Sequence, residues 1–505
     1  MYRLSFDFLE NEHWFGGRIN NGYKMPIGPT DTHTDDSLSF GDQSSPFFCS
    51  TKGRYIYSDD GFVTEFKNGK VLAKSPYHPI RLYDGFGDLK GAYQAAQKAH
   101  FPQDGIMPAR AMFTGPQYCT WIEFDVRQNQ KGIIDYAKSI LEAGMPAGEI
   151  IIDDGWQKGF GDWNFTDKFE NPKAMCDELR EMGFDVILWI VPFISKNVPD
   201  FEYLKENKCL VRDWLGRPVV RNWWNGDDCV LDFSAPKAQE WFFNVTSRLV
   251  EEFGVKGFKQ DAGDAYFYKK SDRTHGKVTP TQQCELWMRS GLSFRYNEFR
   301  ASFKGAGVGV CQRLGDKDHQ WEQANGLKSL IPHMLLLGIT GHPFACPDMV
   351  GGGQIDNFRN EAYKFDNELF SRWAQASALM PMIQFSKSLW RWQDEPTRNR
   401  IINAASLHSK YADYIISLAH ESAKTGEPIV KYLEYSFPNQ GFEKTVDCFM
   451  LGDKYLVAPV LEKGETTRTV TLPTGTWSHN GKTHNGGETV TFDVTLDELL
   501  VLERI

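Results

Sequence analysis

The chain has 505 residues, enough for roughly two to four domains, because a single hydrophobic core rarely supports so long a chain. Its formal net charge of -10 argues against nucleic acid as a partner, since a phosphate-binding face needs clustered Lys and Arg. No run approaches the roughly 18 apolar residues of a membrane helix, and the polar, acidic start does not read as a signal peptide. These features favour a cytoplasmic protein with no nucleic-acid or membrane partner.

The cysteine pattern predicts neither a metal site nor a disulfide framework. There are nine cysteines, an odd number, and they are scattered and never arranged as C-x-x-C. We therefore expect reduced, buried thiols and no metal or other cofactor. Aromatic residues make up 14% of the chain, and several Trp lie in polar neighbourhoods where an indole can stack on a sugar ring.

The first hundred residues show short alternations of polar and apolar residues, broken by Gly, Asn and Asp, as in residues 54–72. This pattern is typical of antiparallel hairpins, and it predicts a short N-terminal β domain over residues 1–105.

From about Ala109 the pattern changes to short apolar strands alternating with helices, which predicts an α/β (β/α)₈ TIM barrel over residues 106–425. The expected strands are 118–126, 148–154, 185–194, 255–263, 307–313, 339–346 and 381–386. An eighth strand lies either just before Asp316 or at 427–433, and the sequence leaves the choice open. The expected helices are 131–144, 171–182, 236–253, 281–303, 321–337, 365–379 and 396–424. Strand patterns with Gly, Thr and Asn turns then return, which predicts a C-terminal β-sandwich over residues 426–505.

Aspartates recur where the expected barrel strands end, which is the rim that carries the active site in such barrels. They are Asp153, Asp154, Asp261, Asp264, Asp316, Asp318 and Asp348. Each one alone is more readily explained as a helix cap, so the conjunction carries the inference. Retaining glycoside hydrolysis needs two carboxyl groups about 5–5.5 Å apart, which two rim aspartates can supply.

Two rival chemistries lack their signatures. Metal-dependent hydrolysis usually needs several His ligands, and no H-x-H or H-E-x-x-H occurs. Phosphate chemistry lacks a G-x-x-x-x-G-K-[ST] loop.

Eight blocks between about residues 150 and 465 occur in a recognisable order: IIDDGWQKGFGDWNF, FDVILWIVPFIS, RNWWNGDDCVLDFSAPKA, GFKQDAGD, RLGDKDHQWE, GHPFACPDMVGG, ALMPMIQFSKSLWRW and YLVAPVLEKG. In these blocks the chain resembles glycoside hydrolase family 31 and, within it, an α-galactosidase-like branch. The resemblance implies a retaining exo-α-glycosidase that hydrolyses terminal α-linked sugars through a covalent glycosyl-enzyme, with α-galactosides favoured.

By this resemblance Asp261 is the nucleophile and Asp316 the acid/base, with Asp318 as its nearest rival. Trp321 and Asp261 are the expected reasons for Asp316 to hold its proton. The residues expected to bind substrate or to balance its pocket's charge are Asp153, Asp154, Trp189, Trp224, Asn225, Lys259, Arg313 and Asp348.

Several alternatives stay open. An α-glucosidase, an α-xylosidase or a transglycosylase would use the same residues, and a catalytically silent sugar-binding protein would keep the same barrel. The expected partner is a small oligosaccharide or glycoside. Sugar identity, linkage, aglycone and homo-oligomer formation are not decided by the sequence.

Overall fold

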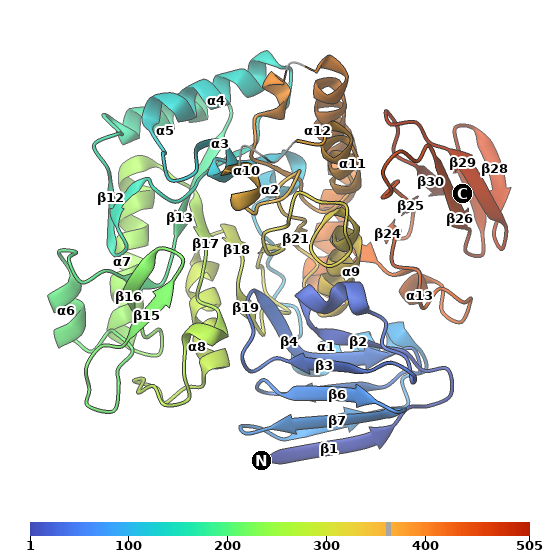
Figure 1. Ribbon diagram of the computed structural model, residues 1–505, viewed down its shortest axis with the longest axis horizontal. Helices are drawn as coiled ribbons and strands as arrows, with labels where there is room; N and C mark the ends of the chain where they lie inside the picture. The colour runs from blue at the N-terminus through green and yellow to red at the C-terminus, as the bar shows by residue number, and fades with distance from the viewer. Residues whose placement is uncertain (360–364, 393) are drawn as a thin grey trace.

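The computed structural model describes residues 1–359, 365–392 and 394–505. A parallel eight-stranded barrel lies between two N-terminal β-sheets, drawn in blue, and a C-terminal group of strands, drawn in red (Figure 1). The barrel order is β21-β20-β18-β17-β13-β10-β9-β22, and a parallel bridge between Met349 and Gln384 brings the two ends together. The barrel is therefore nearly closed, and the predicted fold class is confirmed.

Each expected strand range overlaps one barrel strand. These strands are β9 (Gln117–Cys119), β10 (Glu149–Ile152), β13 (Asp185–Ile190), β17 (Gly257–Gln260), β20 (Gln312–Arg313), β21 (Ala345–Cys346) and β22 (Gln384–Phe385); the barrel also contains β18 (Tyr296–Phe299).

The remaining barrel strand, β18, corrects the sequence prediction. It lies inside the range 281–303 that was expected to be helical, whereas helix α8 (Pro280–Ser290) ends earlier. Both candidates for the eighth strand are wrong: the segment before Asp316 is β20, and 427–433 contains β23 (Val430–Lys431) of a C-terminal sheet. The signal was hidden because β18 carries the fully buried Glu298, whereas buried parallel strands usually read as apolar runs.

Most helices match their expected ranges within a few residues. They are α4 (Gln130–Glu142), α5 (Pro172–Glu181), α7 (Pro236–Phe253), α11 (Asn367–Ser377) and α12 (Glu395–Thr425), whereas α9 (Leu330–Ile339) begins later than expected. Helix α5 begins as expected, with Pro172 in its first turn and the Asn171 side chain accepting the Ala174 N–H. Helix α9 departs from its expected range of 321–337, because Trp321 lies in a loop, where its indole donates to Asp366.

Short elements follow several strands at the rim of the barrel. They are α3 (Trp121–Phe124), the hairpin β11 (Gln157–Gly159) and β12 (Asp162–Phe165), the sheet β14 (Phe193–Ile194), β16 (Gly226–Val230) and β15 (Val220–Trp223), α6 (Phe201–Glu206), η2 (Ala265–Phe267), η4 (Leu327–Ser329), α10 (Asp356–Arg359) and η5 (Leu389–Arg391). Two expected strands are shortened by them, since 118–126 continues into α3 and 185–194 divides between β13 and β14.

The N-terminal region forms two antiparallel sheets, as the alternating sequence predicts. One has the order β1-β7-β6-β3 and the other contains β2, β4, β5 and β8. Their bounds are β1 (Tyr2–Asp7), β2 (Trp14–Arg18), β3 (His33–Asp36), β4 (Gln43–Ser50), β5 (Tyr55–Ser58), β6 (Val63–Lys67), β7 (Lys70–Ser75) and β8 (Ile80–Tyr83). Asn68 and Gly69 both have positive φ and make the β6–β7 turn, which explains the Asn-Gly pair.

Two features of this region were not predicted. Helix α1 (Leu89–His100) and the turn η1 (Ile19–Lys24) interrupt the β pattern. In addition, β19 (Ser302–Phe303), which follows barrel strand β18, pairs in parallel with β4. The N-terminal sheets are thus joined to the barrel by backbone pairing.

The C-terminal strands form a six-stranded sheet with a separate two-stranded sheet. The larger has the order β23-β24-β25-β30-β27-β28, with β24 (Phe449–Leu451), β25 (Tyr455–Val457), β27 (Thr476–His479), β28 (Lys482–Asn485) and β30 (Val501–Arg504); the smaller pairs β26 (Thr467–Thr471) with β29 (Thr489–Asp493). The turn α13 (Leu433–Ser436) precedes β24. A separate core that includes Leu456, Trp477 and Leu502 holds these strands together.

All nine cysteines are buried and unpaired, as expected. Among the described residues, no helix combines the length and the apolar character that crossing a membrane requires.

Arg372 of α11 connects the barrel to the C-terminal strands, and it provides a test of how the two are held together. Its buried guanidinium donates to the carbonyl oxygens of Glu465 at 2.8 Å and Thr495 at 3.1 Å. Arg372→Met should lower the free energy of unfolding by about 2–3 kcal/mol, because it removes charge-assisted hydrogen bonds from a buried guanidinium to these carbonyl oxygens. Denaturant unfolding measures this change.

Arg289→Met on α8 is the matched control, because Arg289 is exposed and makes one surface ion pair with Glu285. Such pairs contribute about 0–1 kcal/mol. Equal losses in the two variants would contradict the bridging role of Arg372.

Candidate active site

A cavity of about 520 Å³ opens at the carboxyl ends of the barrel strands. Every predicted site residue except Asp348 lines it. Its lining consists of Asp42, Trp121, Val126, Asp153, Asp154, Trp189, Trp224, Asn225, Lys259, Asp261, Tyr266, Arg300, Arg313, Asp316, Gln354, Ile355, Asp356 and Arg359. The structure thus brings together carboxylates and cations from strands far apart in the sequence.

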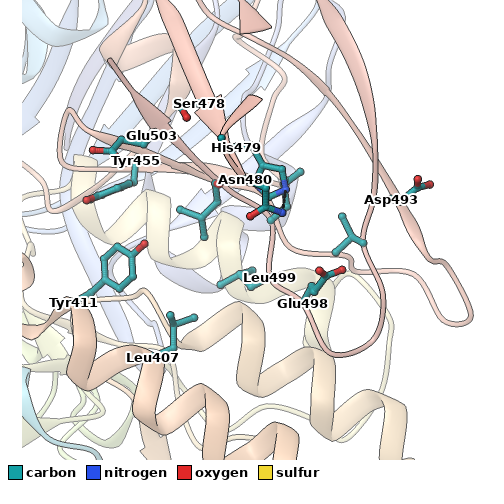
Figure 2. A pocket seen from close by; sticks show the side chains of 14 residues that line it. Leu407, Tyr411, Tyr455, Ser478, His479, Asn480, Asp493, Glu498, Leu499 and Glu503 are labelled. Carbon is teal, nitrogen blue, oxygen red and sulfur yellow. Dashed lines mark hydrogen bonds between the residues drawn. The ribbon is translucent and has the colours of Figure 1, made fainter. Parts of the chain in front are cut away.

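A second hollow, of about 470 Å³, lies between α12 and the strands β25, β27 and β30 (Figure 2). Tyr411 of α12 and Tyr455 of β25 contribute to its wall. None of the predicted site residues lines it, so the cavity at the barrel rim is the candidate active site.

Asp261, directly after β17, has both carboxylate oxygens held. Its Oδ2 accepts the Trp189 indole N–H at 2.9 Å, and its Oδ1 accepts the Ala262 backbone N–H at 2.8 Å and Arg300 Nε–H at 2.6 Å. Burial works to raise the pKa of Asp261, but Arg300 foremost, followed by Lys259, lowers it below the ordinary value. The carboxylate is therefore kept charged and oriented.

Arg300 was missed by the sequence prediction. It follows β18 directly and makes ion pairs with Asp261, with Asp264 and with Asp42 of the N-terminal region. Its guanidinium carbon also lies 5.1 Å from the centre of the Trp224 ring. The signal was lost because the preceding strand was taken for a helix, so position 300 was not recognised as a strand end.

Lys259, two residues before Asp261, has Asp153 as its ion-pair partner. Its Nζ lies 2.7 Å from Asp153 Oδ2, and both side chains are buried. Burial disfavours the lysine's charge, but Asp153 raises its pKa above the usual value. Lys259 therefore fixes Asp153 while it also lowers the pKa of Asp261.

Asp154 faces the cavity beside this pair. Its Oδ1 accepts from Gln157 Nε2 at 2.7 Å, and its Oδ2 accepts from Asn225 Nδ2 at 2.8 Å. Burial raises the pKa of Asp154 to about 6, although these two hydrogen bonds lower it. Asn225, at the turn between β15 and β16, thus helps to orient a carboxylate at the cavity wall.

Arg313 of β20 compensates three acids at once. Its NH1 lies 2.8 Å from Asp316 Oδ1 and 2.8 Å from Asp348 Oδ1, and its Nε lies 3.1 Å from Glu298 Oε1. Asp348 does not line the cavity; it accepts the backbone N–H groups of Lys317 and Gly353. Asp348 therefore supports the segment that carries Asp316, whose own side chain is 31% exposed.

The weaker sequence candidates have other roles. Asp318 accepts from Asn325 and does not line the cavity. Trp321, the other residue expected to act on Asp316, does not line the cavity, and its indole donates to Asp366.

His333, His342 and Gln384 are buried and do not line the cavity. His333 lies 2.6 Å from Lys317 Nζ, and His342 is buried. Gln384 donates to Gln117 and Glu298 in the barrel interior. Within the described ranges, no group of three or more His, Cys, Asp and Glu side chains is arranged to hold a metal ion.

This geometry defines a class: a (β/α)₈-barrel protein with paired rim carboxylates, the arrangement that glycoside hydrolysis requires. Two family models match the chain. The glycosyl hydrolases family 31 TIM-barrel domain matches residues 105–418, and the family 31 C-terminal domain matches residues 426–504. The chain belongs to glycoside hydrolase family 31, a family of glycosidases.

Known proteins of differing specificity are similar to the chain. The myogenesis-regulating glycosidase of Mus musculus is 33% identical over 96% of this chain and 74% of its own length. A sulfoquinovosidase of Agrobacterium fabrum is 27% identical over 68% of this chain and 55% of its own length. Neutral alpha-glucosidase C of Homo sapiens is 26% identical over 81% of this chain and 47% of its own length. The chain therefore spans about half the length of several curated relatives.

Solved structures of the family share the fold. A Flavobacterium johnsoniae dextranase complexed with glucose has a TM-score of 0.83 at 21% identity, covering 99% of this chain and 66% of its own. An α-xylosidase from a soil metagenome complexed with xylose also has a TM-score of 0.83 at 21% identity, covering 99% of this chain and 79% of its own.

The charge balance around Arg313 gives a stability prediction. Arg313→Met removes the cation that pairs with the buried Asp348 and Glu298 and with the partly exposed Asp316, so the free energy of unfolding should fall by about 3–5 kcal/mol at pH 7.5. Burial already raises the pKa of Asp348 to about 6 and that of Glu298 above its usual value, and Arg313 lowers both. Without Arg313 these pKa values rise further in the folded state. The variant therefore loses stability as pH rises through these raised pKa values. The difference in unfolding free energy between the variant and the wild type should be smaller at pH 5, where the acids bind protons.

Denaturant unfolding of the variant and the wild type at the two pH values measures the deficit. A deficit of the same size at pH 5 and pH 7.5 would contradict the role of Arg313 as a counter-charge.

Proposed function

We propose that the protein is a retaining exo-α-glycosidase that hydrolyses terminal α-linked sugars, with α-galactosides favoured, through a covalent glycosyl-enzyme. The observation that carries the proposal is the pair Asp261 and Asp316, which line one cavity in different environments. Asp261 is buried among cations that keep it ionised, as a nucleophile requires, whereas Asp316 is partly exposed beside a single arginine.

In the proposed reaction Asp261 attacks the anomeric carbon, and the bond to the leaving oxygen breaks. Asp316 gives its proton to that oxygen. Asp316 then takes a proton from water, which attacks the same carbon and releases Asp261. Asp318 does not line the cavity and is held by Asn325, which favours Asp316 as the acid/base.

The opposite part of the cavity is the proposed sugar-binding wall. Asp154 and Asp153 accept hydroxyl hydrogen bonds from the terminal sugar, and Trp189, Trp224 and Asn225 complete the wall. Asp348 acts at one remove through Arg313. We propose domain boundaries at 1–105 for the N-terminal β domain, 106–425 for the barrel and 426–505 for the C-terminal β-sandwich. A cytoplasmic location and a small oligosaccharide or glycoside as the binding partner are also proposed.

The choice of α-galactosides rests on the eight sequence blocks between about residues 150 and 465, which resemble an α-galactosidase-like branch of the family. The relatives carry names of several specificities, including sulfoquinovosidase and neutral alpha-glucosidase. A panel of 4-nitrophenyl α-glycosides decides among them: the galactoside should give the highest kcat/KM. A higher kcat/KM for the glucoside or xyloside would change the proposed substrate but leave the proposed reaction standing. The absence of turnover with every glycoside of the panel would contradict the proposed glycosidase activity.

The acid/base assignment predicts a selective defect. A nitrophenolate leaves without much protonation, so Asp316→Ala should retain far more of its glycosylation rate on aryl glycosides than on natural ones. Azide needs no base. It should therefore restore turnover and yield the α-glycosyl azide, whereas Asp261→Ala should be inactive on every substrate. Equal losses on both substrate types with no azide rescue, together with the selective pattern in Asp318→Ala, would transfer the role to Asp318.

Asp154 should control sugar affinity in a pH-dependent way. Because burial raises its pKa to about 6, its charged, accepting form is present above that pH and is lost below it. Asp154→Asn should raise KM at least about tenfold, since the site's other polar groups are then mispaired with the sugar. The loss of affinity at acidic pH that we expect for the wild type should also disappear.

Asp227→Asn is the control, on the β15–β16 hairpin that carries Asn225, because Asp227 is exposed and pairs with Asn222 outside the cavity. Steady-state kinetics between pH 5 and 8 measure both variants. An unchanged KM in Asp154→Asn would remove Asp154 from the sugar-binding wall.

A further inference from the structure

The two oxygens of the Asp261 carboxylate are not equivalent. Among the described residues, Oδ1 accepts two hydrogen bonds, from Ala262 N–H and Arg300 Nε–H, whereas Oδ2 accepts one, from Trp189. A carboxylate oxygen has about two lone-pair positions. Oδ1 is therefore saturated, and Oδ2 keeps a lone pair that can point at a reacting carbon.

The group that saturates Oδ1 is itself held on every side. Arg300 binds Asp42 through NH1 at 2.5 Å and Asp264 through NH2, and one face of its guanidinium is covered by Trp224. A planar fork of donors that meets three carboxylates has one orientation that satisfies them all. Arg300 can thus define where Oδ1 sits.

Asp42 reaches this cluster from the N-terminal sheets. Its position just before β4 is fixed by Asn20 Nδ2, which donates to Asp42 Oδ2 at 2.7 Å, and by its own N–H, which donates to Asp264 Oδ1 at 2.6 Å. The absence of a side chain at Gly315 makes room for it, because a Cβ there would lie 2.7 Å from Asp42 Oδ2. The N-terminal region therefore touches both the arginine of Asp261 and the segment that carries Asp316.

We propose that Arg300, anchored by Asp42, is the positioning residue of the nucleophile, and that Oδ2 of Asp261 is the atom that attacks the sugar. The inference rests on the proposed function. As the Oδ2–C1 bond forms, the C1–O bond to the leaving group breaks, and its electron pair stays on the leaving oxygen, which takes the proton of Asp316. Arg300 and Ala262 hold Oδ1 still throughout. The N-terminal β domain then contributes a residue, Asp42, that the active site needs for the orientation of its nucleophile.

The kinetic test asks whether the charge and the planar donor geometry of the Arg300 guanidinium are needed, or only the volume of its side chain. Arg300→Ala should lose roughly 100-fold or more in kcat on the best nitrophenyl α-glycoside of the panel, with a smaller change in KM, because the lost contact serves the reacting carboxylate. Guanidinium ion at millimolar concentration should restore part of that rate. Methylammonium, which has the same charge without the fork, should restore less.

The domain test uses two matched substitutions in the N-terminal region. Asp42→Asn should lower kcat about tenfold or more, since it removes one anchor of Arg300. Asp60→Asn is the control: Asp60 is buried, also belongs to the N-terminal region, and also accepts hydrogen bonds from the barrel, from Thr279 and Thr281, but it is outside the cavity. Its kcat should stay within about twofold of the wild type, and unfolding midpoints show whether either variant has lost its fold.

A crystal structure of the glycosyl-enzyme trapped with a fluorinated glycosyl fluoride identifies the attacking atom. The sugar should be bonded to the oxygen that faces Trp189, with Arg300 still on the other oxygen. Attachment through the oxygen that Arg300 holds would overturn the inference, as would Arg300→Ala with kcat unchanged or not rescued by guanidinium. Attachment to a residue other than Asp261 would overturn the proposed function instead.

Discussion

A carboxylate that serves as a nucleophile must stay charged in a cavity from which water is largely removed, and an unpaired buried charge is costly. Asp261 depends on fixed cations for this. Lys259 precedes it on the same strand, Arg300 follows the next strand, and Arg313 lies one strand further. Each cation is in turn compensated by other acids, as Lys259 is by Asp153. The site is therefore an alternating array of charges in which no member is independent of the rest.

The barrel topology makes such an array possible. Parallel strands bring residues that are distant in the chain to one rim, so the residues at or directly after the ends of β17, β18 and β20 lie close together. The N-terminal sheets complete the array with Asp42, and pairing between β19 and β4 fixes their position on the barrel. In the proposed function, Asp261 and Asp316 carry the catalytic steps, and Asp154 and its neighbours bind the sugar in the same cavity.

The sequence was sufficient where a local pattern marks a strand end. Asp154 follows the largely apolar strand β10, and Asp261, which follows β17, stands in a block that resembles the family; both line the cavity. Arg300 was not found, because β18 contains the buried Glu298 and lacks the apolar run that marks such strands. Asp42 was not found for a different reason: it acts across more than 200 residues of chain, from a turn whose local sequence carries no catalytic signal. Both residues owe their place in the site to partners that are distant in the sequence, and only the folded structure shows those partners.

The central claim is that Asp261 becomes covalently attached to the sugar. Incubation with a fluorinated glycosyl fluoride, which slows release of the intermediate, followed by proteolysis and mass spectrometry of the peptides, tests it directly. The account predicts one added glycosyl group per chain, located on Asp261 and absent after Asp261→Ala. A label on another carboxylate, or turnover with inverted anomeric configuration and no label, would contradict it.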